Sequence, residues 1–183
     1  MVEPDAAPRA RVFYALWPDA GLARAIGAHG ARLEAVVGGR LVRPGTLHLT
    51  LAFLGEVGCA SLAQLAAPPP AVTAPCFDLR LDRCGVWPHN GIAWLAPASM
   101  PPALALLQQR LWSWLESLGF ASDPRAFRPH VSLLRRVRAP LAEGAIEPLA
   151  WSVRHWRLVR SRLSPQGADY EPLGRFALQG EDR

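Results

Sequence analysis

The chain has 183 residues, of which 50% are apolar and 19% are charged. This composition excludes a disordered protein, and the length suits one domain whose core needs no disulfide or metal. The net charge of +5 suits an anionic ligand such as RNA or a nucleotide. Proline interrupts the long uncharged stretches, so no membrane span is expected.

The predicted elements, in chain order, are a loose tail at 1–10, a strand at 11–17, a helix at 22–37, a strand at 47–53, a short helix at 61–67, strands at 77–81 and 92–95, a helix at 102–118, and strands at 127–134, 156–163 and 170–178. Asp19 is the predicted N-cap of the first helix, and Gly38 and Gly39 end it. Gly119 is the predicted cap after the long helix. This order favours an α+β fold with largely antiparallel sheets over a doubly wound parallel fold.

The cysteines are three, Cys59, Cys76 and Cys84, and they contain no CxxC pair. Their spacing fits neither a zinc site nor a disulfide framework. We therefore predict reduced thiols in a cytoplasmic protein. The sequence has no HExxH, GxGxxG or P-loop motif, so we expect no metal and no cofactor.

Two short segments on predicted strands share one pattern of histidine, apolar residue, small hydroxyl and apolar residue. They are HLTL at 48–51 and HVSL at 130–133. Residues i and i+2 of a strand share a face, so His48 points with Thr50, and His130 points with Ser132. The apolar residues between them anchor each strand in a core.

This pattern suits phosphoryl transfer, in which one imidazole takes a proton from the nucleophile and another gives a proton to the leaving oxygen. Two imidazoles are needed because the attacking and leaving oxygens lie on opposite sides of phosphorus. The hydroxyls can donate hydrogen bonds to the non-bridging oxygens. The pattern alone leaves open which histidine is the acid.

With these motifs, the sequence resembles the 2H phosphoesterase superfamily, and within it the bacterial RNA 2′,3′-cyclic phosphodiesterase (2′-5′ RNA ligase) family. The matching stretches are RVFYALWP (11–18), LHLTLAFLGEV (47–57), LQQRLWSWLESLGF (107–120), FRPHVSLLRRV (127–137) and LVRSRLSPQGADYEPLGRF (158–176). Ser132 stands where this family commonly has threonine, and it keeps the hydroxyl.

The resemblance implies a single bilobal domain over 1–183, with two mostly antiparallel sheets around a central cleft and pseudo-twofold symmetry. It implies that His48 donates a proton to the leaving 3′-oxygen and that His130 activates water. Thr50 and Ser132 would hold the phosphate, and the product would be a 2′-phosphate. The implied substrates are RNA ends or small nucleotides with a 2′,3′-cyclic phosphate, and we expect a monomer with no obligate protein partner and no membrane.

Two residues beyond the motifs have an uncertain direction. Strict alternation puts Arg135 on the face opposite His130, where it is either a solvated strand end or, if the strand end breaks the alternation, a contact for RNA phosphate. Alternation also places Phe53 with Leu49 and Leu51, so we predict that Phe53 belongs to the core and is no platform for a base.

Two arginine clusters, at 135–138 and 154–162, fit either an RNA-binding surface that uses Trp151 and Trp156 for stacking, or a solvated face beside core tryptophans. Two alternative functions remain. The same histidines would serve a reversible 2′-5′ RNA ligase, in which a 5′-hydroxyl replaces water. The fold would also serve as an RNA- or nucleotide-binding module without catalysis.

Overall fold

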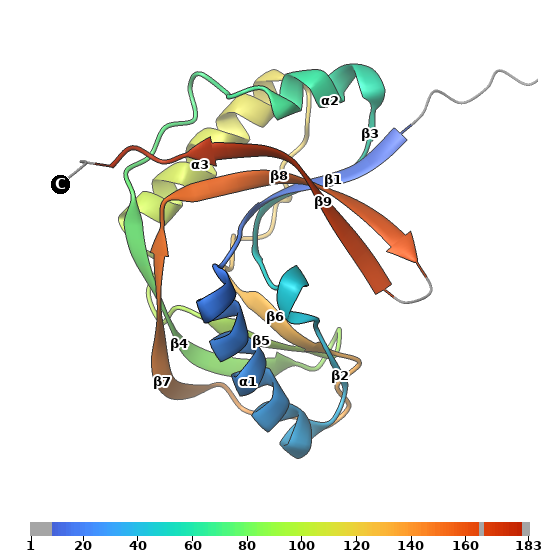
Figure 1. Ribbon diagram of the computed structural model, residues 1–183, viewed down its shortest axis with the longest axis vertical. Coiled ribbons are helices and arrows are strands. Elements are labelled where there is room, and N and C mark those ends of the chain that lie inside the picture. The colour runs from blue at the N-terminus through green and yellow to red at the C-terminus, as the bar shows by residue number, and fades with distance from the viewer. Residues whose placement is uncertain (1–8, 165–166, 181–183) are drawn as a thin grey trace, which may run out of the picture.

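The computed structural model describes residues 9–164 and 167–180 (Figure 1). Its elements are β1 (Arg9–Leu16), α1 (Ala20–Val37), β2 (Arg40–Leu41), the 3-10 turn η1 (Pro44–Thr46), β3 (Leu49–Gly58), α2 (Cys59–Ala66), β4 (Phe77–Trp87), β5 (Ile92–Ala96), α3 (Pro102–Ser117), β6 (Val131–Arg135), β7 (Gly144–Val153), β8 (His155–Ser164) and β9 (Gly167–Ala177). Within the described ranges, no helix has the length and apolar character needed to cross a bilayer.

In this part of the chain, the strands form one antiparallel sheet in the order β7-β4-β5-β6-β3-β1-β8-β9, with β2 beside β6. The predicted α+β class is confirmed. The two expected sheets are hydrogen-bonded into one, because β3 and β6 pair at Leu49 and Val131. This pair is the joint between two halves of the sheet. The β6 half contains β7, β4, β5, β6 and β2, and the β3 half contains β3, β1, β8 and β9.

The helices α1 and α3 each pack against the half of the sheet to which the preceding strand does not belong. α1 follows β1 of the β3 half but packs against β2, β6 and β7, whereas α3 follows β5 of the β6 half and packs against β3, beside α2 (Figure 1). Apolar residues fill the space between helices and sheet, and Leu49 and Val131 at the joint are fully buried. The core thus runs beneath both histidine strands and fixes them against each other.

The predicted helix signals are confirmed. The Leu22 N–H donates to the Asp19 side chain at 2.8 Å, which caps α1. Gly38 and Gly119, after the ends of α1 and α3, have φ values of 65° and 86° that favour glycine. The buried stripe of α3 consists of Leu104, Leu107, Leu111 and Leu115.

Some predicted boundaries are wrong. The strand expected at 127–134 begins only at Val131, because Pro129 has no N–H for a ladder and β3 pairs with β6 at Val131 alone. The tail expected at 1–10 ends earlier, since Arg9 and Ala10 already pair within β1; residues 1–8 lie outside the described ranges. β3 begins at Leu49 and β6 begins at Val131, so each motif histidine lies one residue before its strand.

Two strand regions escaped the sequence patterns. β7 is an edge strand that contains Pro148 close to a register irregularity, a place where proline is tolerated. β4 continues past 81 to Trp87 through a weakly β-prone stretch that includes Gly85. A Cβ at Gly85 would lie 2.7 Å from the ring of Trp94 on the neighbouring strand, so only glycine lets the two strands pack this closely.

Candidate active site

The joint between the two halves gathers the four motif residues on one face. Leu49 pairs with Val131, and both point into the core. Extending this antiparallel register by one residue puts His48 opposite Ser132 and Thr50 opposite His130. The four polar side chains therefore form a block of two imidazoles and two hydroxyls on the face opposite the core.

A β-bulge follows the hydroxyl on each strand. In β3, the partners along β1 jump from Ala52 to Thr50, and in β6, the partners along β5 jump from Leu134 to Ser132. The extra residues are Leu51 and Leu133, and each is buried together with its successor. An extra residue shifts the alternation by one, so the next side chain on each strand returns to the face of the histidines.

These bulges set the directions of the Phe53 and Arg135 side chains. Phe53 is 49% exposed and lines the cavity described below, so the prediction that it belongs to the core is wrong. Arg135 also lines this cavity, on the same side as Ser132, so the expectation from strict alternation is wrong there too. Phe53 and Arg135 occupy matching places, five residues after His48 and His130.

Both imidazoles are oriented by the backbone in the same way. His48 Nδ1 lies 2.7 Å from the Thr46 carbonyl, and His130 Nδ1 lies 2.8 Å from the Arg128 carbonyl. Because a carbonyl oxygen can only accept, each Nδ1 carries the proton and donates it. In the neutral ring, Nε2 is then left with a lone pair for proton transfer.

His48 is enclosed by aromatic rings. Trp17 stacks on it with 5.3 Å between ring centroids, Phe13 lies at 4.8 Å, and the edge of Tyr170 lies at 5.3 Å. Burial lowers the pKa of His48 to about 4; the Thr46 carbonyl opposes this shift, and positive charges on Arg135 and His130 add to it. His48 is therefore neutral at pH 7 in the absence of an anion.

His130 has fewer aromatic neighbours. Trp87 makes an edge contact with it at 4.6 Å between centroids. Burial lowers the pKa of His130 as well, and the nearby charge of Arg135 contributes, while the Arg128 carbonyl opposes the change. His130 is not a lining residue of the cavity, but it is close enough to affect the pKa of His48.

The cavity beside these residues has a volume of about 560 Å³. Of the described residues that line it, none belongs to α1, α2 or α3, since the helices cover the opposite face. Five of the lining side chains are guanidinium groups, from Arg11, Arg40, Arg43, Arg135 and Arg136. Such a cavity favours a phosphate-bearing ligand.

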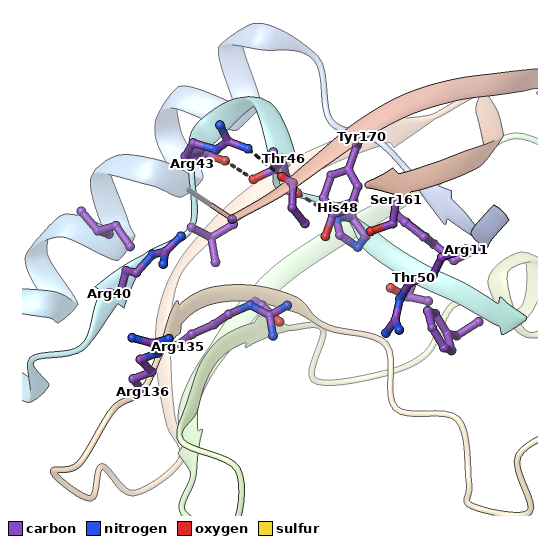
Figure 2. A pocket seen from close by; sticks show the side chains of 17 residues that line it. Arg11, Arg40, Arg43, Thr46, His48, Thr50, Arg135, Arg136, Ser161 and Tyr170 are labelled. Carbon is purple, nitrogen blue, oxygen red and sulfur yellow. Dashed lines mark hydrogen bonds between the residues drawn. The ribbon is translucent and has the colours of Figure 1, made fainter. Parts of the chain in front are cut away.

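The arginines lie around His48 in two groups. Figure 2 shows Arg11 at one end of the cavity, and Arg40, Arg135 and Arg136 at the other. Arg40 and Arg135 face each other across β2 and β6, where an anion would relieve the repulsion of like charges. Arg43 forms an exposed ion pair with Asp169 at 2.7 Å.

The second predicted arginine cluster has a different outcome. Trp151 and Trp156 are 4% and 1% exposed, so they are core residues and offer no ring for stacking. Arg160 and Arg162 line a neighbouring cavity rather than the one at His48. Cys59, Cys76 and Cys84 are in the reduced thiol form.

Several residues of the site were missing from the sequence analysis. Phe13 and Tyr170 contact His48, and Arg11 and Arg40 line the cavity. Alternation along the strand at 11–17 could have predicted two of them. Arg11 and Phe13 share one face, opposite the buried Val12 and Tyr14. Arg40 and Tyr170 meet the site through long-range strand pairing, which no local pattern shows.

A metal centre finds no support in the described chain, which holds no cluster of three His, Cys, Asp or Glu side chains fit to bind an ion. Independence of metal stays a prediction, and it needs a chelator to test it.

The sequence profile of the 2′-5′ RNA ligase superfamily matches residues 18–164. The chain belongs to this superfamily. Among curated members, it is 35% identical to the RNA 2′,3′-cyclic phosphodiesterase of Escherichia coli over 144 residues, which covers 76% of this chain and 80% of that protein. It is 32% identical to the RNA 2′,3′-cyclic phosphodiesterase of Thermus thermophilus, with 93% and 91% of the two chains covered.

Solved structures of the superfamily share the fold. The crystal structure of Escherichia coli LigT complexed with 3′-AMP superimposes with a TM-score of 0.81 at 31% identity, over 94% of this chain and 99% of that one. The resemblance first drawn from the two histidine motifs is confirmed at the level of family and fold.

Proposed function

We propose that this protein hydrolyses the 2′,3′-cyclic phosphate of an RNA end or nucleotide to a 2′-phosphate, with His48 as the proton donor and His130 as the proton acceptor. The observation that carries the proposal is the block of two imidazoles and two hydroxyls at the joint of the sheet. The names of the relatives support the same reaction and favour neither the ligase nor the non-catalytic alternative.

The proposed reaction is an in-line displacement. His130 Nε2 takes a proton from water while the water oxygen bonds to phosphorus, and the bond from phosphorus to the 3′-oxygen breaks. His48 Nε2 gives its proton to that oxygen. The products are a 3′-hydroxyl and a 2′-phosphate, and exchange with solvent returns both imidazoles to their starting state.

The other polar groups stabilise the phosphate. We assign the Thr50 and Ser132 hydroxyls as donors to its non-bridging oxygens, and the Arg135 guanidinium as the charge that offsets the developing negative charge. Arg135 is therefore proposed to contact the substrate RNA at its terminal phosphate.

Because the pKa of His48 is low in the free protein, we infer that the bound substrate promotes protonation of this imidazole. At a pKa of about 4, the free protein keeps His48 neutral at pH 7, so it has no proton on Nε2 to donate. A phosphate anion bound beside the ring raises that pKa and favours the imidazolium. Protonation of His48 is thereby coupled to binding.

One chain supplies both histidines and both hydroxyls, which supports a monomer as the working unit. The continuous sheet and the exchanged helices support a single bilobal domain. Reduced cysteines suit the cytoplasm, which we propose as the location.

The test incubates the purified protein with a short RNA that ends in a 2′,3′-cyclic phosphate, in excess EDTA. We expect conversion to a 2′-phosphate, unchanged by the chelator. A parallel reaction adds an RNA with a 5′-hydroxyl to detect joining. An unchanged substrate, or a 3′-phosphate product, would overturn the proposal.

A further inference from the structure

The face of the sheet that carries His48 has a small apolar cluster of its own, separate from the main core. Its buried members are Phe13, Ala15 and Val159, and Trp17 and Tyr170 pack against them. Alternation along β1 explains this placement, because Phe13 and Ala15 point away from the main core and Trp17 continues their series just after the strand. The imidazole of His48 lies at the edge of this cluster and contacts three of its rings.

The side chain of Trp17 is restrained from several directions. Pro18 follows it and limits Trp17 to extended backbone angles, and Asp19 then caps α1. The Arg157 guanidinium lies 5.6 Å from the centre of the indole ring. The ring of Tyr170 meets the indole nearly at a right angle, with 5.9 Å between centroids. The indole therefore has little freedom to turn.

The imidazole of His48 lies face to face with this indole. Their planes differ by 11°, whereas Phe13 and Tyr170 are inclined to the imidazole by 34° and 86°. The hydrogen bond from His48 Nδ1 to the Thr46 carbonyl restrains one ring atom, and the broad torsion of a histidine ring still lets the plane turn about that contact. A parallel indole removes this freedom, because a turning imidazole would drive its edge into the indole.

The ring contact of His130 is of another kind. Trp87 meets it edge-on, at 74° between the planes. This difference suits the two proposed roles, because a proton donor must meet one oxygen whose position the bound substrate fixes, whereas a water molecule can adjust its position to the base. Accurate orientation of the ring is therefore more important for the donor.

We propose that Trp17 is a positioning residue for the proton donor, in that its indole fixes the plane of the His48 ring and so directs Nε2 at the leaving oxygen. This inference rests on the proposed function and adds a residue to it. Trp17 itself does not line the cavity, so it acts through His48 and makes no contact with the substrate.

The test uses Trp17→Met and Trp17→Leu, which keep an apolar side chain without a ring face, and Trp17→Phe, which keeps a ring face. On an RNA with a terminal 2′,3′-cyclic phosphate, the variants without a ring should lose about thirtyfold in kcat while KM changes by less than about twofold, because proton transfer is misaligned and binding is intact. Trp17→Phe should recover most of this loss. Either variant without a ring suffices if the other does not fold.

The control is Trp112→Leu, which removes another half-buried indole, on α3 across the sheet from the cavity. It should leave both kcat and KM unchanged.

A second substrate separates positioning from a merely structural role. In this analogue, sulfur replaces the leaving 3′-oxygen of the cyclic phosphate, and a thiolate leaves without a proton. A residue that acts through the donor is then no longer needed, so Trp17→Met and Trp17→Leu should come within about threefold of the wild type. A general disturbance of the fold would slow both substrates equally.

The outcomes distinguish this inference from the proposed function. An equal loss on both substrates, a rise in KM with kcat unchanged, wild-type kcat without the ring, or no recovery in Trp17→Phe would overturn the role of Trp17 and leave the hydrolase intact. Failure of the wild type to hydrolyse the oxygen substrate, or an equal loss in His48→Ala on both substrates, would overturn the assigned donor and this inference with it.

Discussion

The β3 half and the β6 half each bring a histidine to the joint along the same backbone path. Each histidine precedes its strand by one residue and donates Nδ1–H to the carbonyl two residues earlier. A hydroxyl follows two residues later, and then comes a bulge. The backbone therefore offers two equivalent imidazoles.

The surroundings make them different. Three aromatic rings enclose His48, whereas Trp87 is the aromatic contact of His130. After the bulges, the β3 half presents Phe53 and the β6 half presents Arg135. The comparison teaches that the backbone fixes where the two imidazoles lie, while the neighbouring side chains set how strongly burial lowers the pKa of each.

The largest effect should come from removing either imidazole. We expect His48→Ala and His130→Ala each to lower kcat by about a thousandfold, because each removes one of two coupled proton transfers. The double variant should be little worse than either single variant, since the two groups act as a unit. The control is His29→Ala on α1, which should leave kcat unchanged. A loss of kcat in only one of the two site variants would contradict a mechanism that needs both imidazoles.

The next effect concerns Arg135, which follows the bulge of the β6 half at the place where the β3 half has Phe53. Arg135→Gln should lower kcat/KM by about a hundredfold, because a guanidinium that stabilises the transition state is lost. Arg138→Gln removes an exposed charge of the same segment outside the cavity and should change little. Similar losses in both variants would mean that Arg135 acts through overall charge alone.

The difference in enclosure should appear in the stability of the free protein. Unfolded histidine protonates near ~6.5. Buried His48 stays neutral down to about 4, so the unfolded state binds more protons as pH falls. Between about pH 7.5 and about pH 5, His48 should therefore cost about 2 kcal/mol of unfolding free energy.

Urea unfolding at both pH values would measure this loss. His48→Asn should remove it, and His130→Asn should remove less, because the pKa of His130 is lowered less far. Equal effects of the two variants would contradict the difference in enclosure.

The smallest effect belongs to Phe53. Its ring faces the cavity, and the Arg11 guanidinium lies 4.7 Å from its centroid. We expect Phe53→Ala to raise KM about fivefold, at the low end of the stacking of a base on an aromatic ring. Phe53→Trp should keep KM near the wild-type value, and a KM that rises equally in both variants would exclude stacking.

The local pattern of the sequence was sufficient for the motif faces, because His48 and Thr50 lie only two residues apart and no bulge separates them. It failed at Phe53 and Arg135, since a bulge adds one residue without any mark in the sequence. The enclosure of His48 by Tyr170 depends on the order of strands in the sheet. β7 was missed because an edge strand accepts Pro148, which local patterns interpret as a break.

The most direct test of which histidine is the proton donor uses an RNA with a terminal 2′,3′-cyclic phosphorothiolate, in which sulfur replaces the 3′-oxygen. A thiolate leaves without a proton, so the loss of the acid should matter little and the loss of the base should matter as before. We predict that His48→Ala comes within about tenfold of the wild type on this substrate, while His130→Ala stays about a thousandfold slower. Rescue of His130→Ala instead, or of neither variant, would contradict the assignment of His48 as the proton donor.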